Sequence, residues 1–587
     1  MEIPATLSEE ALYRAGLTPL TIGVTGHRDL VEAEVPQIRL RIEALLVSLQ
    51  RRCPDRPLRI LSALAEGADR IVADVALKLG VDVTAVLPMP ADLYRLDFTD
   101  EGSAEQFDRL CEQAVEVLEL PIISEFSREQ LSKAGKARNL QYARLGIFLC
   151  AHSHVLLALW DGKPSDELGG TAQVVRFHHH DIMEGFSAPD EINPQILADD
   201  ESDLVYQIVV SRRRENGEPR AGLKPLDAFW LTTDEDNPYT PTLPEQYATI
   251  FERTNEFNQD AKRFARRICA ECSRLISGEA AQRLPPSLRL IDAFFCAADW
   301  LAIYYQRRFV NALKYTHALA FAMALMFLLY SDAISSELFV FILGACSVLA
   351  FSVHRVAARR KWQAKYLEYR TLAEGLRVQL YWAAAGVTSA STTKYAHDNF
   401  LQKQDIELAW IRNVMRVSGM TCDVSPNLDP GGLAFVLKEW IGEESQGGQL
   451  KYYQSKAHQH IRRSRRIDTM GKIVGFSAMV LLAGAVAAPT EHLRTALVVL
   501  LAILLLLVSI REAYASRAAE KEVVRQYEFM YRIFHNARKR LAGADTDAHR
   551  KRILRILGEA ALDEHAEWIL LHRERPLEES QVWRMHG

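Results

Sequence analysis

The chain has 587 residues, which is too long for one hydrophobic core and predicts two to four domains. Its 70 basic residues nearly balance its 75 acidic residues, so the net charge of −5 argues against a general nucleic-acid coat, and we expect no nucleic-acid partner. Hydrophobic residues make up 49% of the chain, an ordinary fraction, but they are concentrated in two blocks beyond residue 310.

The first 20 residues contain Glu2, Glu9 and Glu10 and no apolar run, which is not typical of a cleaved signal peptide. We therefore expect the N-terminal part to stay in the cytoplasm, a reducing compartment that suits eight cysteines. Cys269 and Cys272 are the one close pair, and they lack a second pair or a histidine at zinc spacing. A helical turn is therefore favoured over a metal site.

The triplet "HHH" at residues 178 to 180 also suggests a metal at first sight. Three consecutive side chains cannot all face one ion from regular secondary structure. A polar loop or helix face is therefore favoured for these histidines.

Between residues 17 and 235, short apolar runs alternate with amphipathic segments. "LTPLTIGVTGHRDL" predicts a strand and a loop. "LRILSALAEGADRIVADVALKLG", "VDVTAVLPMP" and "QYARLGIFLCAHSHVLLALWDGK" continue the alternation, and "LGGTAQVVRF" is a Gly-Gly turn before a helix. Such units predict a Rossmann-like α/β domain, a parallel sheet with helices on both faces. The first predicted helix, "VPQIRLRIEALLVSLQRRC", has on one face Ile38, Ile42, Leu45, Leu46 and Leu49.

Further along, "DLVYQIVVSRRRENGEPRAG" predicts a strand, a turn at Asn216 and Gly217, and a return strand that closes the edge of the sheet.

In sheets of this kind, ligands bind beyond the carboxyl ends of the strands. Glycine turns at helix N-termini together with arginines suit phosphate, and carboxylates can accept ribose hydroxyls, so the sequence predicts a nucleotide-derived ligand. For each loop taken alone, ordinary tight turns and helix caps remain an alternative. His27, Arg28 and Arg70 are the candidates for phosphate. The full set of candidate ligand-binding residues is Gly23, Thr25, Gly26, His27, Arg28, Ser62, Glu66, Gly67, Asp69, Arg70, Pro88, Tyr94, Asp97, Asp161, Gly169, Gly170 and Thr171.

Neither a Gly-x-Gly-x-x-Gly motif nor a Gly-Lys-Thr phosphate loop is present, which disfavours a dehydrogenase or an NTPase. The order and spacing of "GVTGHRDL", "LSALAEGADRIVADVALKLG", "VLPMPADLYRLDF" and "LLALWDGKPSDELGGTAQVV" resemble the SLOG superfamily. That Rossmann-like group includes the cytokinin-activating phosphoribohydrolases, the DNA-processing A proteins and the nucleotide-sensing N-terminal domains of TRPM channels. The resemblance implies that residues 17–235 form a nucleotide-binding domain with "GVTGHR" as its first ligand loop.

The phosphoribohydrolase branch carries a Pro-Gly-Gly-x-Gly-Thr-x-x-Glu motif with a catalytic glutamate. Here "ELGGTAQVV" lacks the third glycine and has Gln173 and Val174 near the position of that glutamate. Because a catalytic acid must reach the scissile bond, we expect ligand binding without catalysis, with no catalytic residue, metal or cofactor. A membrane-anchored nucleotide N-glycosidic hydrolase that uses Glu66 or Asp69 remains the alternative, and a membrane scaffold with a degenerate Rossmann domain is a third.

Residues 243–308 are helical by pattern and are expected to connect the α/β domain to a membrane part; the polar side chains of "NEFNQD" are expected to form a solvated face rather than a ligand site. Residues 312–353 then hold two apolar stretches around Asp332 and Glu337, and "GKIVGFSAMVLLAGAVAAP" with "LRTALVVLLAILLLLVSI" repeat this arrangement. Each stretch approaches the roughly 20 residues that span a bilayer core, so two transmembrane hairpins are predicted.

Basic residues flank both hairpins, and the positive-inside rule then places the N-terminal domain and the C-terminus in the cytoplasm of a multi-pass protein of the inner membrane. The predicted domains after the connector are 309–386, a first hairpin with its cytoplasmic helix; 387–450, a cytoplasmic linker with a short helix; and 451–575, a second hairpin with its helix. Thus an all-α four-span part follows the α/β domain.

This repeated layout resembles the SLATT domains, two-span effector modules that accompany SLOG domains or nucleotide-synthesising partners in bacterial conflict systems. Gly471 and Gly475 permit close helix approach and hence a homo-oligomer, although ordinary hairpin packing explains them equally. Together the resemblances imply an antiphage effector that senses a cyclic nucleotide or an ADP-ribose-like signal and permeabilises the lipid bilayer. They also imply a partner enzyme that produces the signal.

Overall fold

The computed structural model describes residues 17–98, 101–180, 182–186, 204–234, 238–276, 284–332, 336–387, 400–401, 406–424, 430–442, 447–517 and 520–573. The chain divides into two compact units. Unit 1 comprises Met1–Ala297 and Leu372–Gly432, and unit 2 comprises Ala298–Thr371 and Leu433–Gly587. Segments from both sides of the predicted first hairpin therefore belong to unit 1.

Unit 1 is built on one sheet with the strand order β4-β3-β2-β1-β5-β6-β7-β8. The strands from β4 to β6 pair in parallel, and β7 and β8 are antiparallel additions at one edge. The predicted parallel α/β sheet is therefore confirmed. The strands are β1 Leu20–Gly26, β2 Leu58–Ser62, β3 Asp82–Leu87, β4 Glu116–Glu119, β5 Val155–Trp160, β6 Val205–Val209, β7 Ala228–Leu231 and β8 Tyr239–Thr240.

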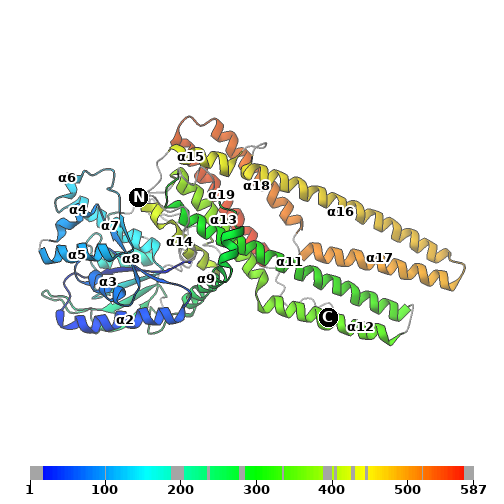
Figure 1. The fold of residues 1–587 in the computed structure, drawn as a ribbon, viewed down its shortest axis with the longest axis horizontal. Coiled ribbons are helices and arrows are strands. Elements are labelled where there is room, and N and C mark those ends of the chain that lie inside the picture. The colour runs from blue at the N-terminus through cyan, green and yellow to red at the C-terminus, as the bar shows by residue number, and fades with distance from the viewer. Residues whose placement is uncertain are drawn as a thin grey trace. The chain divides into compact units, whose positions relative to one another are not determined.

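Right-handed crossovers put the helices between β1 and β4 on one face of the sheet and those flanking β5 on the other. Figure 1 shows both layers around the strands. The five apolar residues predicted to share a face of the first helix are its buried residues. The helices are α2 Val35–Arg52, α3 Ala68–Lys78, α4 Ala91–Tyr94, α5 Glu101–Gln113, α6 Arg128–Leu131, α7 Lys136–His152 and α8 Thr171–His180, with 3-10 turns η1 Glu32–Glu34 and η2 Arg95–Asp97.

The turn at Asn216 does not lead straight into a return strand as predicted. Asn216 has a positive φ of 57°, but the chain rejoins the sheet only at Ala228, the start of β7. The intervening loop is held at the carboxyl edge of the sheet, because Arg213 N donates to Asp29 O and Arg212 forms an isolated bridge with Leu30. A tight hairpin is thus replaced by a loop that lies beside the end of β1.

Helix α9, Glu245–Glu271, belongs to unit 1 and buries part of the "NEFNQD" segment. Asn258 is fully buried: its side chain accepts from Thr18 N and donates to Thr18 O and Asp55 O. The expected solvated face is therefore wrong at this residue, which ties α9 to the start of β1 and to the segment before β2.

Helix α14, Ala409–Val424, lies within the predicted cytoplasmic linker and is buried along almost its whole length. It packs on α7 and β4, where Met420 and Val424 join a core cluster with Leu61 and Phe148. The second half of α13, Trp362–Ala385, packs on it, since Gln379 donates to Met415 O. The linker is thus partly a core element of unit 1.

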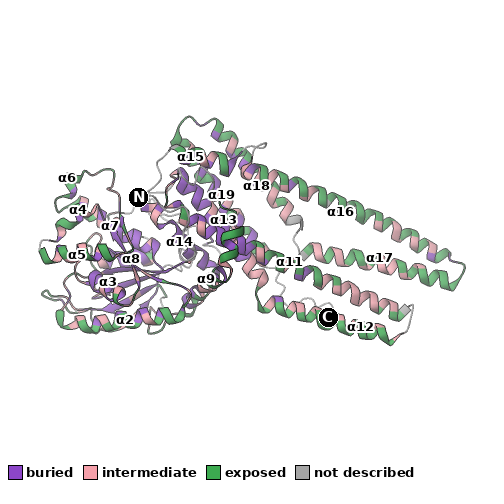
Figure 2. Ribbon diagram, viewed as in Figure 1, coloured by how far each residue is buried: buried purple, intermediate pink, exposed green. Residues whose placement is uncertain are grey.

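Four helices are long and apolar enough to cross a membrane, as expected: α11 Leu288–Asp332, α12 Glu337–Arg359, α16 Gly448–Ala487 and α17 Glu491–Arg517. Figure 2 shows exposed residues along α12, α16 and α17, where apolar side chains such as Phe341 and Val486 face outward. Long helices whose exposed surface is apolar are typical of a multi-pass membrane protein. The remaining helices are α15 Pro430–Val436 with a π-helical turn Leu437–Ile441, α18 Glu520–Ala542 and α19 Asp547–Arg573, and the 3-10 turn η3 is Ile406–Leu408.

Candidate ligand site

A cavity of about 480 Å³ opens at the carboxyl ends of β1 and β5. The chain leaves β1 toward helices on one face of the sheet and leaves β5 toward a helix on the other. This is the switch point at which open α/β sheets bind their ligands. The loop after β1, the start of α7, the loop between β5 and α8, and the loop carrying Arg212 and Arg214 line the cavity.

Many of the sequence-predicted residues meet in this cavity. Those that line it are Thr25, Gly26, His27, Arg28, Asp69, Tyr94, Asp97, Asp161, Gly169, Gly170 and Thr171. Six predicted residues are not among the lining residues, namely Gly23, Ser62, Glu66, Gly67, Arg70 and Pro88.

Two of the glycines outside the cavity serve packing. A Cβ on Gly23 would lie 2.2 Å from Ser153 Oγ, behind the sheet. Gly67 has φ +78° and supports Arg28 directly, because a Cβ there would lie 2.4 Å from Arg28 O. Gly23 thus allows β1 to pack against the segment that follows α7, and Gly67 brings the first two βα loops into contact.

Arg70 was predicted to face phosphate, but its guanidinium is engaged inside unit 1. It donates to Leu64 O, Ser103 O and Gln106 Oε1, and it stacks 4.5 Å from the centre of the Phe98 ring. Glu66 accepts from the Ser103 hydroxyl. Both side chains therefore tie the β2–α3 loop to α5.

Ser62 and Pro88 also make internal contacts: the Ser62 hydroxyl donates to Asp69, and Pro88 O accepts from the Gln141 amide. The Asp69 carboxylate further accepts from Ala63 N at 3.1 Å. Burial raises the pKa of Asp69 to about 6 against the effect of these hydrogen bonds. Asp69, which lines the cavity, is thus held in place by hydrogen bonds from the end of β2 and the residue after it.

One wall of the cavity is cationic and aromatic. Arg28, whose side chain is 46% exposed, lies 3.7 Å from Asp97 and 5.9 Å from the centre of the Tyr142 ring. Burial lowers the pKa of Arg28, but Tyr94, Tyr142 and Asp97 outweigh it and raise the pKa overall, so the guanidinium stays charged. Arg138 pairs with the same carboxylate of Asp97. Sequence reasoning missed Tyr142 and Arg138, which come from α7.

The opposite wall is the loop from β5 to α8. Gly169 has φ +76°, and its close approach to α7 leaves no room for a side chain, since a Cβ would lie 2.7 Å from Ala143 N. The turn that follows aims the start of α8, with its partial positive charge, at the cavity. Gly170 and Thr171 thus lie where a phosphate would be stabilised.

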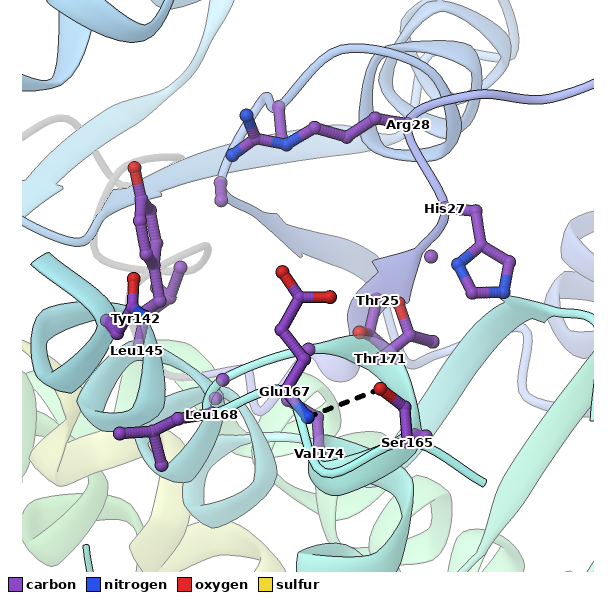
Figure 3. A pocket seen from close by; sticks show the side chains of 18 of the residues that line it. Thr25, His27, Arg28, Tyr142, Leu145, Ser165, Glu167, Leu168, Thr171 and Val174 are labelled. Carbon is purple, nitrogen blue, oxygen red and sulfur yellow. Dashed lines mark hydrogen bonds between the residues drawn. The ribbon is translucent and has the colours of Figure 1, made fainter. Parts of the chain in front are cut away.

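Glu167 precedes this turn, and sequence reasoning did not single it out. Figure 3 shows its side chain projecting into the open space of the cavity between Arg28, Tyr142 and Thr25. Its carboxylate has no hydrogen-bond or ion-pair partner among the described residues. The signal that could have found it is its position in the loop after a central strand.

His27 and Asp161 form a pair on the side of the cavity away from Tyr142. His27 Nε2 lies 3.2 Å from Asp161 Oδ1, which also accepts from Lys163 N at 3.0 Å. Burial alone would raise the pKa of Asp161, but the hydrogen bonds from His27 and Lys163 outweigh it and lower the pKa. The carboxylate is therefore ionised although the residue is only 1% exposed.

Within the described residues, no group of three or more His, Cys, Asp and Glu side chains could hold a metal ion. The three histidines at 178 to 180 form the last turn of α8; Cys269 lies in the last turn of α9, and Cys272 is the C-cap residue that follows this helix. The residues that line the cavity supply an arginine, helix-terminal amides, an aromatic ring and carboxylate acceptors. Together these groups suit a phosphorylated, hydroxyl-bearing molecule.

Fold and site define the class: a doubly wound α/β unit with a ligand-sized cavity at its switch point, in a chain with four helices that can span a membrane. Comparison with protein-family models, curated proteins and solved structures finds no match to this chain. The residues of the site are therefore the evidence for its function.

Proposed function

We propose that this protein is a membrane effector of bacterial antiphage defence, in which a SLOG-like unit 1 senses a nucleotide-derived signal and SLATT-like helices permeabilise the inner membrane. The signal is a cyclic nucleotide or an ADP-ribose-like molecule supplied by a partner enzyme. The observation that carries the proposal is the cavity in which Arg28 and the start of α8 converge, in the same chain as four potential membrane spans.

Phosphate recognition rests on Arg28. Its guanidinium is held by Asp97 and Tyr142 yet stays half-exposed toward the cavity, so it can donate to an anion without leaving its partners unpaired. The positive end of α8 faces the same space. Tyr142 offers a ring face on which a base can stack.

Two helices with residues in both units can couple ligand binding to the membrane spans. Helix α11 begins in unit 1 and continues through unit 2 as a membrane span, and α13 returns the chain from the first hairpin into unit 1. A ligand that binds one conformation of unit 1 more tightly than another can therefore bias both helices. In the proposed orientation both hairpins begin and end in the cytoplasm, as their basic flanks require.

The hydrolase alternative is weakened at the residues first considered for it. Glu66 is bound to Ser103, and Asp69 is occupied by Ser62 and Ala63 N. Glu167 keeps the alternative open, because it is a carboxylate without a described partner that projects into the cavity. Product analysis therefore belongs in the first experiment.

The test is dye release from liposomes that contain the purified protein, scanned against cyclic oligonucleotides and ADP-ribose derivatives, with mass spectrometry of the same tubes. Release with intact nucleotide supports a ligand-gated effector, and Arg28→Ala should abolish it. Arg39→Ala is the matched control, because Arg39 pairs with Asp74 and does not line the cavity. Consumption of the nucleotide in sealed liposomes would favour the hydrolase.

A further inference from the structure

One oxygen of the Asp161 carboxylate accepts no hydrogen bond from the described residues. Its Oδ1 is used by His27 and Lys163 N, whereas Oδ2 is buried and has no hydrogen bond from any described residue. The nearest described cation is Arg214, whose NH2 lies 4.0 Å from Oδ2, beyond hydrogen-bonding distance. Asp161 lines the cavity, so this oxygen is an acceptor prepared for something that enters it.

An ionised carboxylate oxygen that is buried without a donor is costly, so a ligand that supplies a hydrogen bond gains affinity there. Two kinds of donor are available, cationic and neutral. Arg214 already lies 4.0 Å from Oδ2, so an ammonium group or a metal ion bound to this oxygen would be repelled by the guanidinium. The suitable donor is therefore neutral.

A hydroxyl group meets this requirement, and the cavity offers a second acceptor for its neighbour. Glu167 projects into the same space with no described partner, and it follows β5 in the same loop as Asp161. Two carboxylate acceptors in one cavity suit two adjacent hydroxyl donors. In a nucleotide, the vicinal 2′,3′-diol of ribose supplies such a pair.

We propose that Asp161 Oδ2 and the Glu167 carboxylate bind the free vicinal diol of a ribose whose phosphate lies toward Arg28 and the start of α8. The signal is then an ADP-ribose-like molecule with an unesterified diol, and not a cyclic dinucleotide in which one hydroxyl of each ribose is esterified. This inference rests on the proposed nucleotide-sensing function and decides between the two signal classes that it left open.

The experiment is isothermal titration of the full-length protein in detergent and EDTA with ADP-ribose, ADP, 2′,3′-dideoxy-ADP and cyclic di-AMP. ADP and its dideoxy analogue differ only in the diol, and wild-type protein should bind ADP at least about tenfold more tightly. In Asp161→Asn, where an amide donor replaces Oδ2, ADP-ribose should bind about tenfold more weakly and the preference for ADP should disappear. Glu167→Gln should weaken ADP-ribose binding less, because Glu167 is exposed.

Asp166→Asn is the matched control: it removes the same charge from the same loop, but Asp166 does not line the cavity, so its affinities should equal those of wild type. Should Asp161→Asn fail to fold, the comparison of ADP with its dideoxy analogue on wild-type protein still tests whether the diol contributes to binding. Equal affinity for those two probes, or binding that requires Mg²⁺, overturns the inference.

The titrations also separate this inference from the proposed function. Arg28-dependent binding of cyclic di-AMP, without binding of ADP-ribose, would overturn the diol site and leave nucleotide sensing in place. If no probe binds wild-type protein and none releases dye from liposomes, nucleotide sensing itself fails.

Discussion

Gly26 and Gly67 bring the first two βα loops into contact. A Cβ on Gly26 would lie 2.4 Å from Ala68 Cβ, and one on Gly67 would meet the backbone of Arg28. Ala68 N donates to His27 O across the same contact. This loop packing determines the conformation of the His27-Arg28 segment. It therefore also determines the direction in which the Arg28 guanidinium points.

Gly67→Ala should lower the free energy of unfolding of unit 1 by about 3 kcal/mol, because it combines an unfavourable positive φ with a backbone clash. Thermal melting of the detergent-solubilised chain measures this. Gly80→Ala is the matched control: Gly80 has a positive φ of 68° but nothing within 4 Å, so only about 1 kcal/mol is expected. Equal effects at both sites would show that the loops do not pack as described.

At the scale of elements, unit 1 uses two helices from outside the predicted α/β segment. Helix α9 is fixed to the amino-terminal edge of the sheet through Asn258, and α14 covers the sheet beside α7. Both carry buried polar side chains into the core. Because such groups are costly unless their hydrogen bonds form, they determine where each helix docks.

Asn258→Ala should destabilise unit 1 by roughly 3 kcal/mol, since it leaves Thr18 N, Thr18 O and Asp55 O without their partner. Asn255→Ala serves as control, because Asn255 accepts a single bond from Asp55 N in a partly exposed position and should cost about 1 kcal/mol. Denaturation midpoints of the two variants test this, and a smaller effect at Asn258 would contradict the docking role.

The docking of α14 should depend on pH. His152 Nδ1 donates to Arg416 O, and His154 donates to Asn413 O while its other nitrogen accepts from Thr21 N. Burial lowers the pKa of His152 to about 4, against the effect of its hydrogen bond, and lowers that of His154 well below 6.5. Both imidazoles are therefore neutral in the folded protein at neutral pH.

In the unfolded chain the same histidines protonate near their ordinary pKa of about 6.5. Between that value and the lowered pKa, the unfolded chain binds more protons, so the free energy of unfolding falls as the pH falls from about 6.5 toward 4. Between pH 7.5 and pH 5, protonation of His152 in the unfolded chain should by itself lower the free energy of unfolding by about 2 kcal/mol.

Melting of the full chain at both pH values, with hydrogen exchange of α14, measures this loss. His180→Gln, a change at an exposed histidine, should leave the slope unaltered. A pH-independent α14 would contradict the prediction.

At the scale of the molecule, Gly471 and Gly475 bear on assembly. Among the described residues, no atom outside their own helical turn lies within 4 Å of a Cβ added at either glycine, so packing within the hairpin does not explain them. By contrast, a Cβ on Gly484 would contact Leu497 of α17 at 3.5 Å. Of the two explanations that the sequence left open, close approach by another copy of the chain is therefore the one we favour.

Replacing both glycines by leucine should shift the detergent-solubilised protein toward monomer and abolish nucleotide-triggered dye release, because the added side chains block close helix approach. Light scattering measures the first effect. Gly344→Leu, another open glycine in a predicted span, is the control and should change neither. A wild-type monomer, or an unchanged oligomer in the double variant, would refute the role of this pair.

The sequence determined the features that depend on local periodicity and composition. Alternating strands and amphipathic helices predicted the parallel sheet, the five buried residues of α2, and the four apolar helices, because each follows from the spacing of side chains within one segment. Chain order placed Arg28, Asp161 and Gly169 at one edge of the sheet, since the carboxyl ends of parallel strands meet there.

Only the tertiary structure decided which neighbours each side chain meets. It directed the Arg70 guanidinium to Ser103, brought Tyr142 and Glu167 into the cavity, and left Asp161 Oδ2 without a hydrogen bond from any described residue. It also drew α14 into the core of unit 1. These contacts join residues that are distant in the chain, and their hydrogen bonds depend on positions that no local pattern encodes.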